Sequence, residues 1–319
     1  MPNPDLISIV LTLKPLPCPP ADVYPLWWGR AAHALLLNVI RQYAPALAEA
    51  LHTNATNQST REELMHSSAE NNQTQPFTVS TLMGHFPHGR TDAAQSYRLR
   101  LSAFQSDIAH ILWQAMLNGP LKIGATIELD YMPFRIENAS CEPTHAEQNK
   151  ELTLQKDMDA SPWMGITTYQ ELSAPFLLAK QSAPHRINFQ FTAPTTFKSG
   201  GKHIPIPLAG LVFGSLLDKW NAFAPIAFPP EVRRFADECL AVTQYRLSTR
   251  PVPVKSGGLR MGAVGEISYT CLNYDRYWMS VIAVLAAFAV YSGVGAATTI
   301  GMGQCRQFPS QKKKPDNPQ

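Results

Sequence analysis

The chain has 319 residues, which is more than one average domain and fits two. It carries 27 Lys and Arg against 24 Asp and Glu, a formal net charge of +3, and its 45% of hydrophobic residues are enough for a sizeable core. These figures exclude the collagen-like, coiled-coil and wholly disordered classes.

The first half of the chain alternates between strand patterns and helix patterns. Residues 26–41 predict a helix whose polar side carries Arg30, His33, Leu37 and Arg41. The polar residues 58–75 predict an inserted flexible loop. The other predicted elements are strands at 7–13, 77–82, 97–101 and 123–132, a short helical segment at 46–52 and an amphipathic helix at 105–117. This order is the β-α-β-β-α-β order of the ferredoxin-like split βαβ unit.

A polar and acidic segment at 138–161 predicts a linker or a long loop. After it we expect strands at 187–191 and 262–271, the second being one long strand or a pair, and helices at 208–221 and 276–292. Two copies of one topology would explain both the chain length and this order. We therefore predict an α+β fold of two tandem ferredoxin-like (RRM-like) domains at 1–160 and 161–308, with a disordered basic tail at 309–319.

Charge is unevenly divided between the two halves. Residues 1–160 have a net charge of −5, whereas residues 161–319 have a net charge of +8, which suggests a polyanionic partner such as a nucleic acid. The five cysteines are scattered and have no metal-ligand spacing, so we expect reduced, buried thiols in a cytoplasmic protein. They are Cys18, Cys141, Cys239, Cys271 and Cys305.

The stretch 277–305 contains no charged residue and could be mistaken for a membrane span. Its continuous apolar part is about 13 residues, shorter than the ~20 that a span needs. A buried helix followed by a glycine-rich loop fits this stretch better. Gly293, Gly295, Gly301 and Gly303 of that loop favour positive φ and let backbone N–H groups approach phosphate. A dinucleotide site is rejected, because a helix and not a strand precedes the loop.

An ordered set of motifs resembles the repeat-associated RNA-binding superfamily of CRISPR systems, and within it the endoribonuclease that processes repeat transcripts. The resemblance extends over roughly residues 5–306. Its motifs are Gly29-Arg-Ala-Ala-His33, Leu47-Ala-Glu-Ala-Leu-His52, Pro76-Phe-Thr-Val-Ser80, Phe191-Thr-Ala-Pro-Thr195, Pro205-Ile-Pro207, Gly262-Ala-Val-Gly265 and the loop Gly293–Gln304.

The resemblance implies two tandem ferredoxin-like domains and a catalytic histidine at His52, with His33 and Arg30 as its support. Two positions depart from the family. Leu37 stands where some members have a tyrosine, and the polar insertion from Gln58 replaces a lysine that sometimes follows the catalytic histidine. These departures suggest an Arg/His variant of the site.

The implied chemistry needs no metal and no cofactor. The ribose 2′-hydroxyl attacks the adjacent phosphate, and histidine can move protons in both directions because its ordinary pKa lies near 6.5. Arginine can offer two fixed N–H donors to phosphate oxygens. The expected products carry a 2′,3′-cyclic phosphate and a 5′-hydroxyl.

RNA binding is expected to be mostly electrostatic and to use basic residues in Gly- or Pro-rich loops of the second half. They are Lys198, Lys202, Arg250, Lys255 and Arg260, together with the four loop glycines. Phe191 and Phe197 are candidates for base stacking, although burial is the alternative for Phe191.

The partners we expect are CRISPR repeat RNA, the processed guide RNA and, by resemblance, other subunits of an effector complex; homodimerisation is left open. Two alternatives to the endoribonuclease remain. One is a non-catalytic RNA-binding subunit of the same superfamily, and the other is a membrane-anchored protein that uses residues 277–300.

Overall fold

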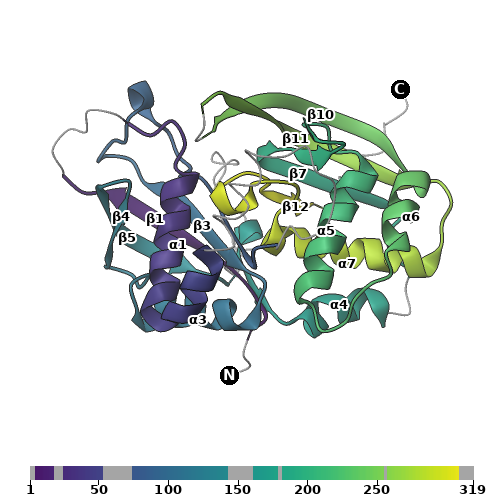
Figure 1. The fold of residues 1–319 in the computed structure, drawn as a ribbon, viewed down its shortest axis with the longest axis horizontal. Coiled ribbons are helices and arrows are strands. Elements are labelled where there is room, and N and C mark those ends of the chain that lie inside the picture. Colours follow the sequence, from purple (N-terminus) through teal and green to yellow (C-terminus); the bar gives the residue numbers. More distant parts are fainter. Residues whose placement is uncertain are drawn as a thin grey trace, which may run out of the picture.

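The computed structural model describes residues 4–17, 24–52, 74–142, 161–178, 182–254 and 257–308. Two antiparallel sheets lie side by side in it, each covered by helices on one face (Figure 1). The predicted polar loop, apart from Gln75 and residue 74, and the predicted basic tail fall outside the described residues, as does Cys18.

The N-terminal sheet has the strand order β2-β3-β1-β5-β4, and β6 pairs with the first residues of β1. Two helices, α1 and α3, pack on one face of this sheet and enclose its core. The bounds are β1 Leu6–Pro15, α1 Gly29–Tyr43, β2 Phe77–Val79, β3 Tyr97–Ala103, α3 Ser106–Asn118, β4 Thr126–Leu129, β5 Met132–Ser140 and β6 Gly165–Thr167. Residues 45–52 form a further helical segment.

The C-terminal sheet has the strand order β10-β11-β7-β12. Its strands and helices are β7 Arg186–Thr195, α5 Ala209–Phe223, α6 Glu231–Cys239, β10 Leu240–Pro253, β11 Leu259–Cys271, α7 Arg276–Ser292 and β12 Cys305–Gln307. Helix α4 Tyr169–Leu177 precedes them, and the small hairpin β8 Phe197–Ser199 and β9 Lys202–Ile204 is inserted after β7.

The two sheets share one strand arrangement. Numbered by their order within the repeated unit, the strands of each sheet run second-third-first-fourth, with every neighbouring pair antiparallel. This is the ferredoxin-like arrangement, so the predicted fold class of two such units is confirmed. The domain boundary at residue 160 stays a prediction, and β6 beyond it pairs with β1.

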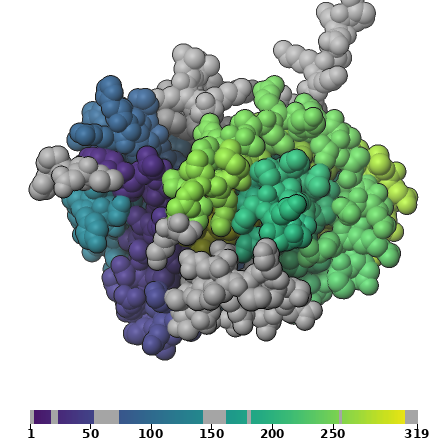
Figure 2. Space-filling view, turned by 45° about the horizontal axis from the view of Figure 1, so that its top comes forward, coloured from purple at the N-terminus to yellow at the C-terminus, as the bar shows by residue number. Residues whose placement is uncertain are grey.

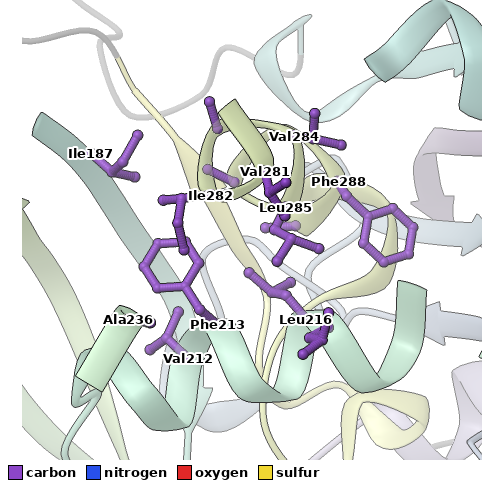
Figure 3. Close-up of a cluster of buried hydrophobic side chains, with 14 of the residues drawn as sticks. Ile187, Val212, Phe213, Leu216, Ala236, Val281, Ile282, Val284, Leu285 and Phe288 are labelled. Carbon is purple, nitrogen blue, oxygen red and sulfur yellow. The ribbon is translucent and has the colours of Figure 1, made fainter. Parts of the chain in front are cut away.

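Helix α7 is the centre of the molecule. Twelve of its residues are buried, from Met279 to Ser292, because α5, α6 and α4 pack on one side of it and strands β1, β2 and β3 on the other. Figure 3 shows side chains of α5 interdigitating with Ile282 and Leu285 of α7. The apolar stretch considered as a membrane anchor is therefore the core helix that joins the two halves. None of the helices in the described ranges has both the length and the apolar character needed to cross a membrane.

Two predicted segments differ from the structure, and some strands were not predicted. The single strand expected at 123–132 is the hairpin β4–β5, which turns at Asp130 and Tyr131, both with positive φ. The first residues of the linker predicted at 138–161 belong to β5, which continues to Ser140, and residues 143–160 lie outside the described residues. Strands β10 and β12 were not predicted, and 259–271 is one long strand that pairs with β10.

The thiols of Cys141, Cys271 and Cys305 are buried and free, as expected, and Cys239 is half-buried and free.

Candidate active site

The glycine-rich loop folds back from the C-terminal half onto helix α1 of the N-terminal half. Trp27 Nε1 donates a hydrogen bond to the Ile300 carbonyl at 2.6 Å, and Gly301 forms a parallel bridge with Ser80. A Cβ on Gly29 would lie 1.7 Å from the Ile300 oxygen, so only glycine allows this approach. The loop and the start of α1 therefore form one packed unit, although some 270 residues separate them.

The four loop glycines all have positive φ, as their spacing predicted. Three of their N–H groups donate within the protein: Gly293 to Ala289, Gly295 to the Ser215 hydroxyl at 2.8 Å, and Gly303 to Pro194. Gly293, Gly301 and Gly303 are buried. These glycines thus shape and fasten the loop, and their predicted contact with RNA phosphate stays a prediction.

His33 lies where this loop meets α1. Its Nδ1 is 3.0 Å from the Thr299 carbonyl oxygen, and its ring packs against Phe77 with 5.4 Å between ring centroids. A carbonyl oxygen can only accept, so Nδ1 carries the proton in this hydrogen bond. In the neutral ring Nε2 is then the acceptor, which is the form that a general base needs.

Burial is the main reason why the pKa of His33 lies below the ordinary 6.5. The hydrogen bond to Thr299 acts in the opposite direction, and the charge of His52 adds a smaller lowering. His33 is therefore more often neutral near pH 7 than an exposed histidine would be. The predicted polar side of α1 is only partly solvated, because Arg30 and Arg41 are exposed, His33 is half-buried and Leu37 is buried.

His52 and Arg30 lie near His33, Arg30 on the same helix α1 and His52 on the helical segment 45–52. His52 is exposed at the end of the helical segment 45–52, and Gln75 holds that end by a 3.3 Å hydrogen bond from its Nε2 to the Leu51 carbonyl. Arg30 is exposed one turn before His33, and its Nη2 donates to the Pro253 carbonyl at the end of β10 at 3.1 Å. The structure thus brings the three predicted catalytic residues to one region.

The hairpin β10–β11 extends from the C-terminal sheet to this region. In Figure 2 its light-green surface lies beside the purple N-terminal segment, in agreement with the contact between Arg30 and Pro253. Arg250 and Arg260, which we expected in loops, lie on these two strands, and Lys198 and Lys202 lie on the exposed hairpin β8–β9. Lys255 lies outside the described residues.

One face of the C-terminal sheet carries a set of arginines, of which only two were among the predicted RNA-binding residues. Residues directly opposite each other in antiparallel strands point to the same face, and successive residues alternate. Glu266 lies opposite Arg246 on one side and Gln190 on the other, and Gln190 also lies opposite Arg306. These four side chains therefore point to one face. The arginines of this face are Arg186, Arg246, Arg250, Arg260 and Arg306.

The opposite face of this sheet is apolar and lies under the helices. Phe189 and Ile267 are neighbours on it and belong to the core shared with α5 and α7. Phe191 and Phe197, considered for base stacking, are both buried. The recurrence of arginine at 246 and 250 was the available sequence signal for the arginine face.

Within the described part of the chain, no three His, Cys, Asp or Glu side chains gather as a metal site would require. The candidate titratable groups of this site are His33, His52 and Arg30, which lie near the glycine-rich loop and the hairpin β10–β11.

A family model described as CRISPR-associated endoribonuclease Cas6 matches residues 189–305, most of the C-terminal unit. The curated Cas6 endoribonuclease of Mycobacterium tuberculosis H37Rv is 30% identical over 126 residues, which is 39% of this chain and 39% of the relative. That of Streptococcus thermophilus is 28% identical over 124 residues, 35% of this chain and 46% of the relative. The matched region thus spans less than half the length of these curated relatives.

Similarity to solved structures extends over both halves. A Cas6 described as a product complex has a TM-score of 0.66 and 25% identity, covering 95% of this chain and 99% of that chain. A Thermus thermophilus Cas6 has a TM-score of 0.59 and 24% identity, with coverage of 95% and 98%. The paired ferredoxin-like arrangement described above is therefore also that of these proteins.

Proposed function

Since the chain belongs to the CRISPR-associated endoribonuclease Cas6 family, we propose that it cuts CRISPR repeat transcripts and so produces guide RNAs. The observation that carries this proposal is the hydrogen bond from His33 Nδ1 to the Thr299 carbonyl. It orients an imidazole with a free acceptor nitrogen next to a second histidine, an arginine and a basic strand hairpin.

In the proposed reaction RNA supplies its own nucleophile. His33 Nε2 accepts the proton of the 2′-hydroxyl, for which its lowered pKa keeps the neutral form available. The oxygen attacks the adjacent phosphate, and the bond to the 5′-oxygen breaks as His52 donates a proton to that leaving oxygen. The products are a 2′,3′-cyclic phosphate and a 5′-hydroxyl, and no metal enters the reaction.

Arg30 is proposed to stabilise the crowded phosphorane. Its guanidinium is exposed and holds the Pro253 carbonyl by one nitrogen at 3.1 Å. A phosphate oxygen is a stronger acceptor for a guanidinium than a peptide carbonyl, because phosphate carries a negative charge and can accept two N–H groups of the guanidinium at once. RNA can therefore take over this donor when it enters the site.

The arginine face of the C-terminal sheet and the hairpin β8–β9 are proposed to hold the RNA backbone. Arg246 and Arg250 are exposed and lie on the strand that ends at the Arg30 contact, so a bound strand could follow them into the site. One Cas6 to which the fold is similar is described in two structures, as a product complex and as a substrate mimic complex. Assembly with effector subunits and homodimerisation stay predictions.

The first test is cleavage of candidate repeat RNAs in EDTA, followed by analysis of the ends. We expect cutting at one position with a 2′,3′-cyclic phosphate on the upstream fragment. A 2′-deoxy substitution at the nucleotide before the cut should abolish cleavage and leave binding intact, because it removes only the nucleophile.

Intact RNA that is tightly bound over several repeat sequences would contradict the enzymatic proposal and favour a non-catalytic RNA-binding subunit. Cleavage that EDTA abolishes and Mg²⁺ restores would contradict the metal-independent mechanism.

A further inference from the structure

Helix α5 carries a lysine into the core beneath the glycine-rich loop. Val212, Phe213 and Leu216 of α5 face α7 in Figure 3, and Lys219 follows Leu216 by three residues, on the same side of the helix. Only 6% of Lys219 is exposed. Lysine is almost never buried to this degree unless it is paired, so its partners must account for its presence.

The partners of the Lys219 ammonium are oxygens at the start of the loop. Its Nζ donates to the carbonyls of Ser292 at 2.8 Å and Gly293 at 3.1 Å, and lies 3.4 Å from the Thr298 hydroxyl. Ser292 and Gly293 are the last residue and the C-cap of α7. The ammonium thus satisfies carbonyls that have no partner within the helix, at the end where the helix dipole favours a cation.

Thr298 connects this lysine to the candidate catalytic histidine. It is the first residue of a short 3-10 turn, η4 Thr298–Ile300. The next carbonyl, that of Thr299, accepts from His33, and the one after it, that of Ile300, accepts from Trp27. One end of this three-residue turn is therefore held by Lys219 and the other by α1.

A purely structural role explains this lysine poorly. Burial lowers the pKa of Lys219 to about 7, so keeping its charge inside the protein costs stability. An apolar side chain of similar length would fill the same space without that cost. What an apolar side chain could not do is bind both Gly293 at the start of the loop and Thr298 within it.

We propose that Lys219 is a positioning residue, which holds η4 so that the Thr299 carbonyl fixes the Nδ1–H form and the orientation of His33. Its effect on cleavage rests on the proposed function, whereas its effect on the imidazole of His33 does not. Without the lysine, the turn is expected to shift and the His33 ring to lose its fixed acceptor.

The test compares Lys219→Met, which keeps the length of the side chain and removes its donors, with the parental protein. Nitrogen-15 NMR of the His33 ring, assigned by the signals missing in His33→Gln, reports which ring nitrogen carries the proton. We expect predominantly Nδ1–H in the parent and a mixture of the two tautomers in Lys219→Met. In single-turnover cleavage we expect the rate to fall about 10²-fold, with repeat RNA affinity unchanged.

Val212→Ala is the matched control, because it removes buried atoms from the same helix and touches none of the loop oxygens. It is expected to lower thermal stability while the His33 tautomer and the cleavage rate remain parental. Lys219→Arg, which keeps the donors, should restore part of the Nδ1–H signal that Lys219→Met loses.

The proposal is overturned if folded Lys219→Met keeps the parental tautomer, or if Val212→Ala changes the tautomer to the same extent at equal loss of stability. If the parent cuts no repeat RNA and Lys219→Met still alters the tautomer, the positioning role stands and the proposed function fails. Loss of the tautomer signal together with a parental cleavage rate would show that His33 is not the base.

Discussion

The two halves of the molecule have the same strand order, but they contribute different parts of the site. The N-terminal unit supplies the ionisable groups His33, His52 and Arg30 from its first helix and the segment after it. The C-terminal unit supplies the loop whose Thr299 carbonyl orients His33, together with the arginine face. In the proposed function, one topology used twice is divided between proton transfer and RNA positioning.

The difference arises from how the second helix of each unit is packed. In the N-terminal unit α3 is amphipathic and covers one face of its own sheet. In the C-terminal unit α7 is apolar nearly all round, because it packs on its own helices and also on strands of the other unit. The residues that follow α7 must therefore emerge at the junction of the two halves, where α1 begins.

The strongest test of this division is His33→Ala. Loss of the general base should lower the single-turnover cleavage rate about 10²–10⁴-fold, while RNA affinity stays parental because a neutral imidazole binds phosphate weakly. His110→Ala on the exposed side of α3 is the control and should cut at the parental rate. A parental rate in His33→Ala would place proton transfer outside the N-terminal unit's first helix.

The junction itself is tested by Gly29→Ala. The added Cβ would meet the Ile300 oxygen at 1.7 Å, so the loop or the helix must shift. We expect the cleavage rate to fall about 10²-fold, as a displacement near 1 Å costs in enzymes. Ala34→Ser, exposed on the same helix, should change neither the rate nor the melting temperature. If Gly29→Ala cuts normally, the close approach of loop and helix is not needed for the site.

The C-terminal unit's share is tested by Arg250→Ala. Because a backbone phosphate contact is lost, RNA affinity should fall for all sequences alike, and the slope of log affinity against log salt should decrease by about 1. The rate at saturating protein should not change. Arg234→Ala is the control, since this residue lies on α6 and pairs with Glu238 at 3.9 Å. An unchanged salt slope in Arg250→Ala would remove this arginine from the binding face.

The smallest effect concerns pH. Because the folded pKa of His33 lies below 6.5, the cleavage rate should rise with pH through a midpoint below that value. Replacing His52 by Gln removes a positive charge, so the pKa of His33, measured by NMR titration, should rise. In the unfolded chain the imidazole of His33 has the ordinary pKa of 6.5, so it takes up a proton at a higher pH than in the folded protein. His33 therefore lowers the free energy of unfolding as the pH falls below 6.5. A pKa of His33 that falls in His52→Gln would contradict the coupling between the two histidines.

Sequence patterns predicted the elements with strong local signals, such as the amphipathic α3 and the apolar α7. The patterns missed β10 because no alternation of apolar and polar residues marks this strand. Residues 243–249 in its middle are all exposed or half-buried, so few of them need to be apolar. They missed the β4–β5 turn because Asp130 and Tyr131 take positive φ without the glycine that usually signals such a hairpin.

The candidate site was predictable only in part, and the reason is sequence separation. His33, His52 and Arg30 could be named from the resemblance, and the positive φ values of the loop from its glycines. The acceptor of His33 could not be predicted, because Thr299 is 266 residues further along the chain and carries no local signal. The same holds for Lys219, which follows Asp218 on a largely apolar helix and has no local signal that indicates the carbonyl oxygens it binds.

That separation has a consequence for synthesis of the protein. A ribosome must make residues 33 to 299 before the imidazole of His33 can meet its acceptor, whereas α1 and most of β10 are complete well before. A nascent or prematurely ended chain that stops before Thr299 therefore carries the histidines and the arginine face without the oriented ring. If the proposed function holds, such a chain lacks the oriented base, and cleavage must wait for translation of nearly the whole fold.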